Sequence, residues 1–585
     1  MMSLLPTARR RIFAGIVLII ASCLPAGAQE QGRAFYTPPA SDAVHAVVAE
    51  HGMVVAQERL AAQIGADVLR RGGNAIDAAV ATGFAMAVTY PRAGNVGGGG
   101  FMVIHSTDHH EDVAIDYRET APAATTREIF LGADGKPDIA KSRDSALAIG
   151  VPGTVAGLTL ALEKYGSGKF ALAELLKPAI DLARDGFVIA DDLADTMQSG
   201  QRRLARWPSA TKIFSGADGK SLRDGDTLVQ TDLAATLSAV SEQGIRGFYE
   251  GPVAEKLVKA IGAAGGIMTS DDLKSYQAVV RAPVRGNYRG YDIVSMPQPS
   301  SGGIVLLETL NILEGYSISD MKQGSAPSLH VMIEAMKRAY ADRARYLGDP
   351  SFVNAPIATL TAKDYGAKQR ASIDPDHATP SADVGTPAPS PREGSNTTHF
   401  SVVDSYGNAI SNTYTLNFPY GVGLVADGTG VLLNNELDDF TAAPGASNAF
   451  GLVGFEANLP GPGKRPLSSM SPTIVLKDGK PVLVTGSPGG SRIISAVLQV
   501  VVNVLDYHMD VAAAVAAPRL HHQWLPDEVR VERGFTEETI AGLKARGHRL
   551  IEPLGQTSTN SIAVTPNGLL GAPDPRTRGA EAAGQ

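Results

Sequence analysis

The sequence predicts an α+β fold in which mainly antiparallel sheets are stacked on each other and covered by helices. Helices and strand hairpins follow one another in blocks along the chain, and one helix is apolar on nearly every side. The 585 residues, 44% hydrophobic and 19% charged, have the composition of a soluble globular protein. The net charge is -8 and the sequence has no long basic run, so it lacks the clustered positive charge that is typical of nucleic-acid-binding proteins.

The predicted helices lie mainly in the first two thirds of the chain. Residues 57–71 have the spacing of an amphipathic helix that Gly72-Gly73 ends. Asn74 caps a second helix, which continues to Val88 and is apolar almost all round, as is typical of a buried helix. Residues 150–370 are predicted to be mainly helical, and Ser301-Gly302-Gly303 opens one long helix within them.

Three hairpins supply the predicted sheets. Their strands are rich in apolar and β-branched residues, and turn residues separate the members of each pair. The predicted strand pairs are 101–105 with 113–116, 397–404 with 409–415, and 473–476 with 482–485. Residues 486–491 then lead into a helix over 493–507.

Residues 1–28 are predicted to be a secretory signal peptide rather than part of the fold. Arg9 to Arg11 form a positively charged start, Ile12 to Ala21 is almost continuously apolar, and Ala26-Gly27-Ala28 offers a small-residue cleavage site. The apolar run is too short to favour a permanent membrane span. We therefore expect a periplasmic or secreted protein that is cleaved after Ala28.

Cys23 leaves a second possibility open at the N-terminus. Ile20-Ala21-Ser22-Cys23 resembles a lipobox, in which Cys23 would carry a lipid anchor. Cys23 is the only cysteine of the sequence, so a chain cut after Ala28 would have none. Disulfides, thiol catalysis and cysteine-based metal sites are excluded for that mature chain.

Residues 371–396 are predicted to be a mobile linker, because five prolines lie among polar and small residues with almost nothing apolar. A strand that starts with Thr397 follows at once. Threonine is a weak nucleophile until a base takes its proton, and its own α-amino group, which titrates at roughly pH 7.7–8.0, can be that base. Cleavage of the Asn396–Thr397 bond would create nucleophile and base together. The alternative is an ordinary interdomain linker followed by a strand.

Seven segments of the chain match, in the same order, those of one enzyme family: Gly72–Ala79, Asp116–Pro122, Pro299–Gly303, Thr397–Ser401, Leu433–Phe440, Arg465–Thr473 and Thr485–Arg492. On these segments the chain resembles the γ-glutamyltransferase (γ-glutamyltranspeptidase, glutathione hydrolase) family of N-terminal-nucleophile hydrolases. The resemblance implies an αββα sandwich of two stacked, mainly antiparallel sheets flanked by helices. It also implies one precursor that is cut into two associated subunits, residues 29–396 and residues 397–585.

Four residues receive catalytic roles from the resemblance. Thr397 would attack the γ-carbonyl of the substrate, and Thr415 matches a second threonine that hydrogen-bonds the nucleophile. Gly489 and Gly490 match the oxyanion hole, and they stand between a strand and a helix, where backbone N–H groups can point at an anion. Without the family match, Thr415 is an ordinary strand threonine and the glycine pair an ordinary turn.

Six residues match positions that bind the amino-acid end of a γ-glutamyl group, which carries an α-carboxylate and an α-ammonium. The planar guanidinium of Arg118 can clamp the carboxylate, with the hydroxyls of Ser468 and Ser469 beside it. Asn417, Glu436 and Asp439 can receive the ammonium. Taken separately, a surface salt bridge at Arg118 and a solvated acidic turn at 436–439 are the simpler interpretations.

One departure from the family pattern concerns the lid loop over the site. Many bacterial members have a tyrosine there, whereas the segment 444–454 of this chain carries Phe450. A lid can still cover the bound glutamyl group, but the contact of the tyrosine hydroxyl is lost.

The expected activity is cleavage of the γ-glutamyl amide bond of glutathione and related compounds through a γ-glutamyl-threonine ester. Water or an acceptor amino acid or peptide would then take up the glutamyl group. This reaction needs no cofactor and no metal. Two alternatives stay open, a cephalosporin or glutaryl acylase on the same scaffold and a catalytically inactive binding homologue. Arg118 and Asp439 together favour an amino-acid substrate over the acylase, because a glutaryl group has no ammonium.

Overall fold

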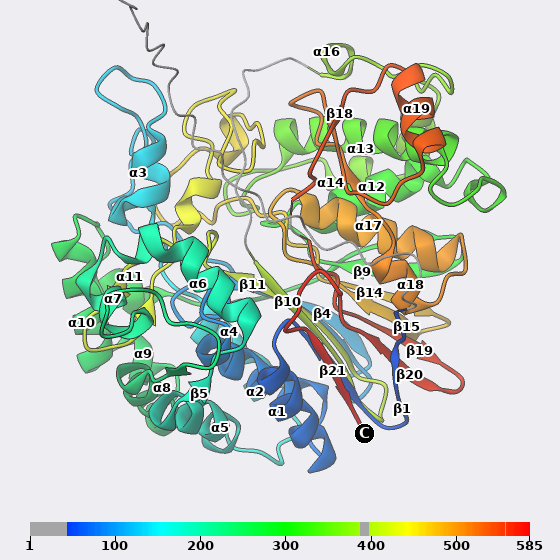
Figure 1. Ribbon diagram of the computed structural model, residues 1–585. Helices are drawn as coiled ribbons and strands as arrows, with labels where there is room; N and C mark the ends of the chain where they lie inside the picture. Colours follow the sequence, from blue (N-terminus) through cyan, green and yellow to red (C-terminus); the bar gives the residue numbers. More distant parts are fainter. Residues whose placement is uncertain (1–43, 386–396, 556) are drawn as a thin grey trace, which may run out of the picture. The chain divides into compact units, whose positions relative to one another are not determined.

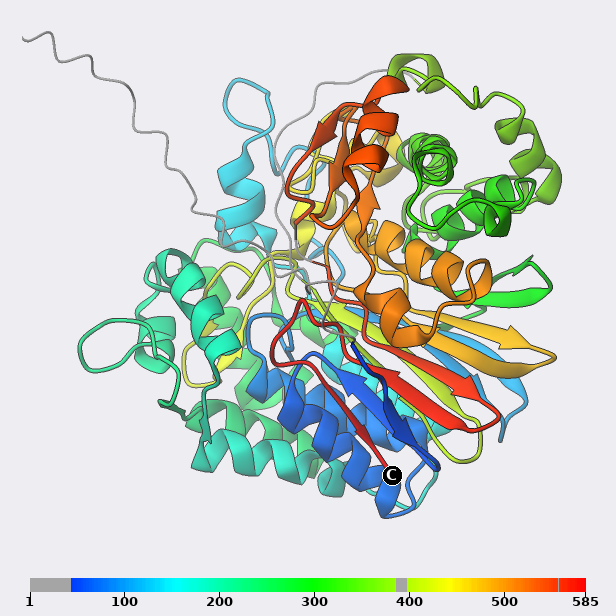
Figure 2. The same ribbon diagram turned by 45° about the vertical axis from the view of Figure 1, so that its right-hand side comes forward.

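Two seven-stranded antiparallel sheets form the centre of the chain, and Figure 2 shows them stacked face to face. The computed structural model describes residues 44–385, 397–555 and 557–585, so the predicted signal peptide, Cys23 and Asn396 lie outside the described residues. The first sheet has the order β21 (Glu581–Gly584), β2 (Met53–Ala56), β10 (Thr398–Val403), β11 (Ala409–Thr415), β3 (Gly99–Ser106), β4 (Glu111–Tyr117) and β7 (Val279–Arg281). The second has the order β1 (Val47–Ala49), β20 (Gly568–Ala572), β19 (Ser561–Thr565), β15 (Lys480–Thr485), β14 (Thr473–Lys477), β9 (Tyr291–Ser295) and β8 (Val284–Tyr288).

Helices cover the outer face of each sheet, which completes the αββα sandwich and confirms the predicted fold class (Figure 1). The first sheet is covered by α1 (Arg59–Arg70), α2 (Ala75–Thr89) and α4 (Thr154–Tyr165), with α5 (Leu172–Asp185) and α8 (Thr231–Gln243) packed behind them. The second sheet is covered by α12 (Gly302–Leu313), α13 (Ala326–Tyr346), α17 (Arg492–Leu505) and α18 (Val511–Ala516).

The other helices and strands lie around these two helix-covered sheets. The remaining helices are α3 (Ile139–Asp144), α6 (Asp191–Leu204), α7 (Pro208–Phe214), α9 (Arg246–Tyr249), α10 (Gly251–Ala263), α11 (Ser270–Ser275), α14 (Ile357–Leu360), α15 (Lys363–Arg370), α16 (Ser381–Val384) and α19 (Glu537–Ala545). The short strands are β5 (Phe187–Val188), β6 (Thr227–Leu228), β12 (Val425–Ala426), β13 (Val431–Leu432), β16 (Leu520–His521), β17 (Val529–Val531) and β18 (Leu550–Ile551). Among the described residues, none of these helices is both long and apolar enough to cross a membrane.

The alternation of side chains along β10 shows how the sequence builds the layers. Phe400 and Val402 point to the helices that cover the first sheet and belong to their apolar cluster. Ser401, between them, points to the second sheet and donates a hydrogen bond to the carbonyl of Asn560 at 2.9 Å. Successive residues of a strand face opposite sides, so one strand serves an apolar helix layer and a partly polar layer between the sheets.

The helix predicted to open at Ser301-Gly302-Gly303 begins where expected but is shorter than expected. It ends at Leu313, and α13 starts as a separate helix at Ala326. Pro327 occupies the first turn of α13, where the missing N–H of proline costs no intrahelical hydrogen bond. Near the end of α13, Arg343 contacts Ser469, a residue of the pocket described below.

The predicted linker 371–396 needs a correction over its first part, residues 371–385. This segment, which we call the strap, includes α16 and is bonded to the body of the protein. Ser381 donates its hydroxyl hydrogen to the carbonyl of Trp524 at 2.6 Å, and the indole N–H of Trp524 donates to the carbonyl of Ser381 at 2.8 Å. The backbone N–H of Ala378 donates to the carbonyl of Arg546 at 2.7 Å. Composition misjudged the strap because hydrogen bonds hold it together with only two apolar side chains, Ile373 and Val384, which pack on the core of the second sheet.

The helix cap at Asn74 offers a test of this local structure. Its side-chain oxygen accepts from the backbone N–H groups of Ile76 and Asp77, and its amide donates to the carbonyl of Tyr165 at 2.9 Å. We expect Asn74→Ala to lower the free energy of unfolding by about 1–2 kcal/mol, because the first turn of α2 loses its cap. Thermal unfolding measures the change. Asn74→Ser keeps the capping oxygen and is expected to retain most of the stability, whereas an equal loss in both variants would rule out the cap as the cause.

Candidate active site

The end of the β10–β11 hairpin places the predicted nucleophile. Thr398 pairs with Tyr414 in the register of the two strands, which brings Thr397 alongside Thr415. Both threonines are almost fully buried. The chain turns sharply after β11 at Asn417, whose φ is 73°, and the backbone N–H of Asn417 donates to the hydroxyl of Thr415 at 2.8 Å.

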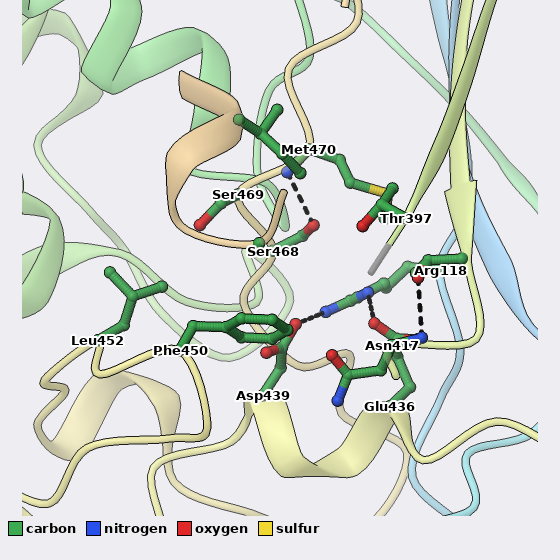
Figure 3. Close-up of a pocket in the computed structure, with 13 residues that line it drawn as sticks. Arg118, Thr397, Asn417, Glu436, Asp439, Phe450, Leu452, Ser468, Ser469 and Met470 are labelled. Atoms are coloured by element: carbon green, nitrogen blue, oxygen red, sulfur yellow. Dashed lines mark hydrogen bonds and ion pairs between the residues drawn. The ribbon is translucent and has the colours of Figure 1, made fainter. Parts of the chain in front are cut away.

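A pocket lies at this end of the hairpin (Figure 3). Its wall comes from segments far apart in the sequence, and it contains nine of the ten predicted catalytic and binding residues: Arg118, Thr397, Thr415, Asn417, Glu436, Asp439, Ser468, Ser469 and Gly490. The tenth, Gly489, directly precedes Gly490. Phe450, Leu452, Met470 and Ile493 complete the wall. Asn396, on the other side of the predicted cleavage site, lies outside the described residues.

Arg118 is bonded to the two acids that were predicted to bind the α-ammonium of the substrate, whereas Arg118 was predicted to bind its α-carboxylate. Its Nη2 donates to Oδ2 of Asp439 at 2.5 Å, and its Nη1 pairs with Oε1 of Glu436. Its Nε donates to the carbonyl of Pro466 at 3.1 Å. The guanidinium is completely buried, so the three groups form one fixed ionic cluster in the floor of the pocket (Figure 3). The sequence placed these residues at one site but did not predict that they pair with each other.

The acids of this cluster are perturbed by their surroundings. Burial raises the pKa of Glu436 and of Asp439, and the facing guanidinium of Arg118 opposes that rise. Glu119 lies behind them, with Oε2 4.0 Å from Nη1 of Arg118, and burial raises its pKa to about 7. Three carboxyl groups therefore share one guanidinium.

The serine pair is held in place by the segment that opens α12. The backbone N–H of Ser301 donates to the carbonyl of Ser468 at 2.8 Å, and the hydroxyl of Ser301 donates to the same carbonyl at 2.7 Å. The hydroxyl of Ser468 in turn accepts from the N–H of Met470 at 3.1 Å. In Figure 3 the serines lie on one side of the Arg118 guanidinium, and Glu436 lies on the other. The pocket thus has a hydroxyl wall and an acidic wall.

The glycine pair follows β15 and precedes α17. Gly489 has a φ of 133° and Gly490 a φ of 59°, values that L side chains rarely adopt. A Cβ added at Gly490 would lie 2.2 Å from Cδ1 of Phe450. Glycine is therefore needed at position 490 both for the backbone turn and for the lid residue above it.

The lid loop closes over the pocket through Phe450. The ring of Phe450 stacks on that of Phe418, with centroids 5.8 Å apart and planes inclined by 22°. Asn448 shapes the loop, since its side-chain oxygen accepts from the N–H of Phe450 at 3.0 Å. The amide of Asn448 donates to Oδ1 of Asp439 at 3.0 Å, which ties the lid to the acidic wall.

Three contributors to the site were missed in the sequence: Glu119, Asn448 and Arg343. Glu119 falls inside a matched segment, directly after Arg118, and its neighbour could have drawn attention to it. Asn448 lies in the lid segment but carries no local signal. Arg343 lies on α13 and reaches Ser469 with Nη2 at 3.3 Å, a contact over 126 positions that no local pattern indicates.

The sequence and the fold match those of known proteins. The family model for gamma-glutamyltranspeptidase matches residues 61–584. The chain belongs to the gamma-glutamyltranspeptidase family. It is 50% identical over 573 residues to the glutathione hydrolase proenzyme of Escherichia coli strain K12, covering 98% of both chains.

Two solved structures place this family member among N-terminal-nucleophile hydrolases. A cephalosporin acylase from Bacillus halodurans superposes with a TM-score of 0.81 over 94% of this chain and 98% of that one, at 28% identity. The gamma-glutamyltranspeptidase of Helicobacter pylori superposes with a TM-score of 0.55 over 59% of this chain and 97% of that one, at 44% identity. The family predicted from the seven sequence segments is confirmed.

Gly490→Ala tests the fit between the glycine turn and the lid. We expect it to lower the free energy of unfolding by about 2–4 kcal/mol, from the positive φ and from the collision with Phe450. Gly463→Ala is the matched control, because Gly463 has a φ of 68° and no atom lies within 4 Å of the added Cβ. Thermal unfolding of both variants isolates the collision as the excess loss at position 490. Equal losses would show that the lid yields without cost.

Proposed function

We propose that this family member is a self-cleaving γ-glutamyltransferase and glutathione hydrolase whose nucleophile is Thr397. The observation that carries the proposal is the position of Thr397, at the start of a central strand and in the wall of the charged pocket. Cleavage of the Asn396–Thr397 bond would turn this residue into a new N-terminus. Its α-amino group would then stand beside its own hydroxyl and act as its base.

The proposed reaction proceeds in two halves. The hydroxyl oxygen of Thr397 attacks the γ-carbonyl carbon, its proton passes to the α-amino group, and the carbonyl oxygen becomes an oxyanion. Backbone N–H groups at Gly489 and Gly490 would stabilise that oxyanion, and Thr415 would orient the attacking hydroxyl. When the C–N bond breaks, the amine product leaves with the proton and a γ-glutamyl ester of Thr397 remains. Water or an acceptor amine attacks the ester and regenerates the hydroxyl.

The amino-acid end of the donor would bind by exchanging partners with the ionic cluster. Arg118 already faces two carboxylates, and a substrate α-carboxylate would take a place beside it and beside Ser468 and Ser469. The α-ammonium would go to the acidic wall at Glu436 and Asp439, next to Asn417. A zwitterion brings one charge of each sign, so its binding leaves the charge balance of the buried cluster unchanged.

The two subunits implied by cleavage would stay together through shared sheets. Strands β10 and β11 would belong to the small subunit, residues 397–585. Their neighbours in the first sheet, β2 and β3, would belong to the large subunit, residues 29–396. Separation would break the two ladders that join these strands and three more, β2 with β21 in the same sheet and β1 with β20 and β9 with β14 in the second sheet. Export by the signal peptide of residues 1–28, with lipidation at Cys23 as the alternative, is likewise proposed from the sequence.

The rival function is that of a cephalosporin or glutaryl acylase. The fold alone does not separate the two, since an acylase superposes well on this chain. Buried acids at positions 436 and 439 favour the γ-glutamyl donor, because a glutaryl side chain offers them no ammonium. An inactive binding homologue is the third possibility, and the presence of Thr397, Thr415 and the glycine pair disfavours it.

Thr397→Ala tests nucleophile and maturation together. We expect this variant to remain a single chain without turnover of a γ-glutamyl 4-nitroanilide, because both the hydroxyl and the new N-terminal threonine are gone. Intact mass and N-terminal analysis of the same sample give the readout. Thr398→Ala is the control: its hydroxyl has no hydrogen-bond partner among the described residues, so we expect two subunits and activity. Two normal subunits from Thr397→Ala would refute the assignment.

Asp439→Asn tests the ammonium site and the acylase alternative. We expect kcat/KM to fall about 10- to 100-fold for γ-glutamyl 4-nitroanilide, because one charged hydrogen-bond partner of the ammonium is lost. Glutaryl 4-nitroanilide has no ammonium and is expected to lose far less. Equal losses on both donors would remove Asp439 from the ammonium site. Faster turnover of the glutaryl donor by the unaltered enzyme would favour the acylase.

A further inference from the structure

Arg343 is a buried cation beside the pocket, and its charge is only partly balanced by Asp439, which is already paired with Arg118. It lies near the end of α13 and is 4% exposed. Its Nε donates to the hydroxyl of Ser301 at 2.9 Å and its Nη2 to the hydroxyl of Ser469 at 3.3 Å. It forms no salt bridge with any residue that the structure describes. Burial lowers its pKa to about 10, so it still carries its charge at neutral pH.

Arg118 presents the opposite situation. Its guanidinium is paired with Glu436 and Asp439 and lies near Glu119, so at least as much negative as positive charge surrounds it. Arg118 alone would therefore give an incoming α-carboxylate little net attraction. Charge that attracts the carboxylate must come from elsewhere, and Arg343 lies behind the hydroxyl wall where that carboxylate is proposed to bind.

The hydrogen-bond directions show how Arg343 can act at a distance. Arginine is only a donor, so the oxygens of Ser301 and Ser469 accept from it and their own hydrogens point elsewhere. The hydroxyl of Ser301 uses its hydrogen on the carbonyl of Ser468. Ser469 is one of the residues that line the pocket. A hydroxyl that accepts from a cation becomes a stronger donor, because bonds in such a chain polarise one another.

Arg343 also lines a second, narrow cavity behind the lid. Its wall includes Arg343, Asn448 and Asn458. Asp439 and Leu452 line both this cavity and the pocket. The only carboxylate in its wall, among the described residues, is Asp439, and that one is paired with Arg118.

We propose that Arg343 is a positioning residue that makes the pocket select donors with a free α-carboxylate, acting through the hydroxyl of Ser469. The inference rests on the proposed function and deepens it. Arg343 makes the serine wall positive and leaves the wall at Glu436 negative, so the zwitterionic end of a donor fits in one orientation. Its guanidinium does not itself touch the substrate.

Three donors separate this role from a merely structural one. γ-Glutamyl 4-nitroanilide carries both charges, glutaryl 4-nitroanilide lacks the ammonium, and 4-aminobutanoyl 4-nitroanilide lacks the α-carboxylate. We expect Arg343→Gln to lower kcat/KM about 10- to 100-fold for the two donors with the carboxylate, mainly through KM, because a charge-assisted hydrogen bond is weakened. The 4-aminobutanoyl donor should change by less than about threefold. Where its turnover is too slow, its inhibition constant against the γ-glutamyl donor replaces kcat/KM.

Two further variants test the route through Ser469. Ser469→Ala should show the same donor pattern, and adding Arg343→Gln to it should cost little more, because groups acting in one chain are not additive. Arg343→Lys keeps the charge and should recover part of the loss. Arg345→Gln is the matched control, since the same change is then made on the same helix at an exposed position outside the pocket.

Each outcome has one meaning. Equal losses on all three donors, or additive losses in the double variant, would overturn the role of Arg343 while leaving the proposed function intact. Failure of the unaltered enzyme to release nitroaniline from the γ-glutamyl donor would instead overturn the proposed function. If Arg343→Gln does not mature into two subunits, the donor patterns of Arg343→Lys and Ser469→Ala decide the question.

Discussion

The site depends on one constraint, the place of β10 in the interior of the first sheet. β2 pairs with it on one side and β11 on the other, so the strand that starts beside Thr397 cannot shift without breaking both ladders. A slip of one residue would also exchange its two faces, moving Phe400 out of the helix-side core. Register and apolar packing together hold Thr397 to one position, beside Thr415 in the wall of the pocket.

Charge is the second constraint, and it acts through specificity rather than stability. A guanidinium and several carboxyl groups have been taken out of water at the end of β4, and burial alone disfavours every ionised form. Pairing offsets much of that cost, but a buried ion pair seldom contributes net stability compared with apolar packing. In the proposed function, the cluster is a fixed template whose ion pairs exchange with the charges of a zwitterionic substrate.

Much of this arrangement was accessible from the sequence. The hairpins were predictable because turn residues bound short β-branched runs, and the cap at Asn74 because its side chain has a defined role at a helix start. The αββα class and nine residues of the pocket wall followed from ordered segments matched to one family. The roles proposed for those residues remain predictions, since lining a pocket does not by itself establish a catalytic or binding role.

The failures have a common physical cause, which is that they concern contacts between distant segments. The strap has the composition of a flexible linker, yet its polar groups find partners at Trp524 and Arg546 that no local rule anticipates. In the sequence, Arg343 is indistinguishable from the other polar residues of its helix, and only the fold shows that it contacts Ser469. The sequence analysis did not predict that Arg118 pairs with Glu436 and Asp439, because it assigned each of the three residues a contact with the substrate and none with one another.

The lid loop, residues 444–454, is held in place by one aromatic and one polar contact. Phe450 has no hydroxyl to donate, and the loop is held instead by stacking on Phe418, whose ring also lies 5.1 Å from the guanidinium carbon of Arg203. The polar part of the attachment is Asn448, which donates to Oδ1 of Asp439 while Arg118 donates to Oδ2. One carboxylate therefore joins the lid to the ionic cluster.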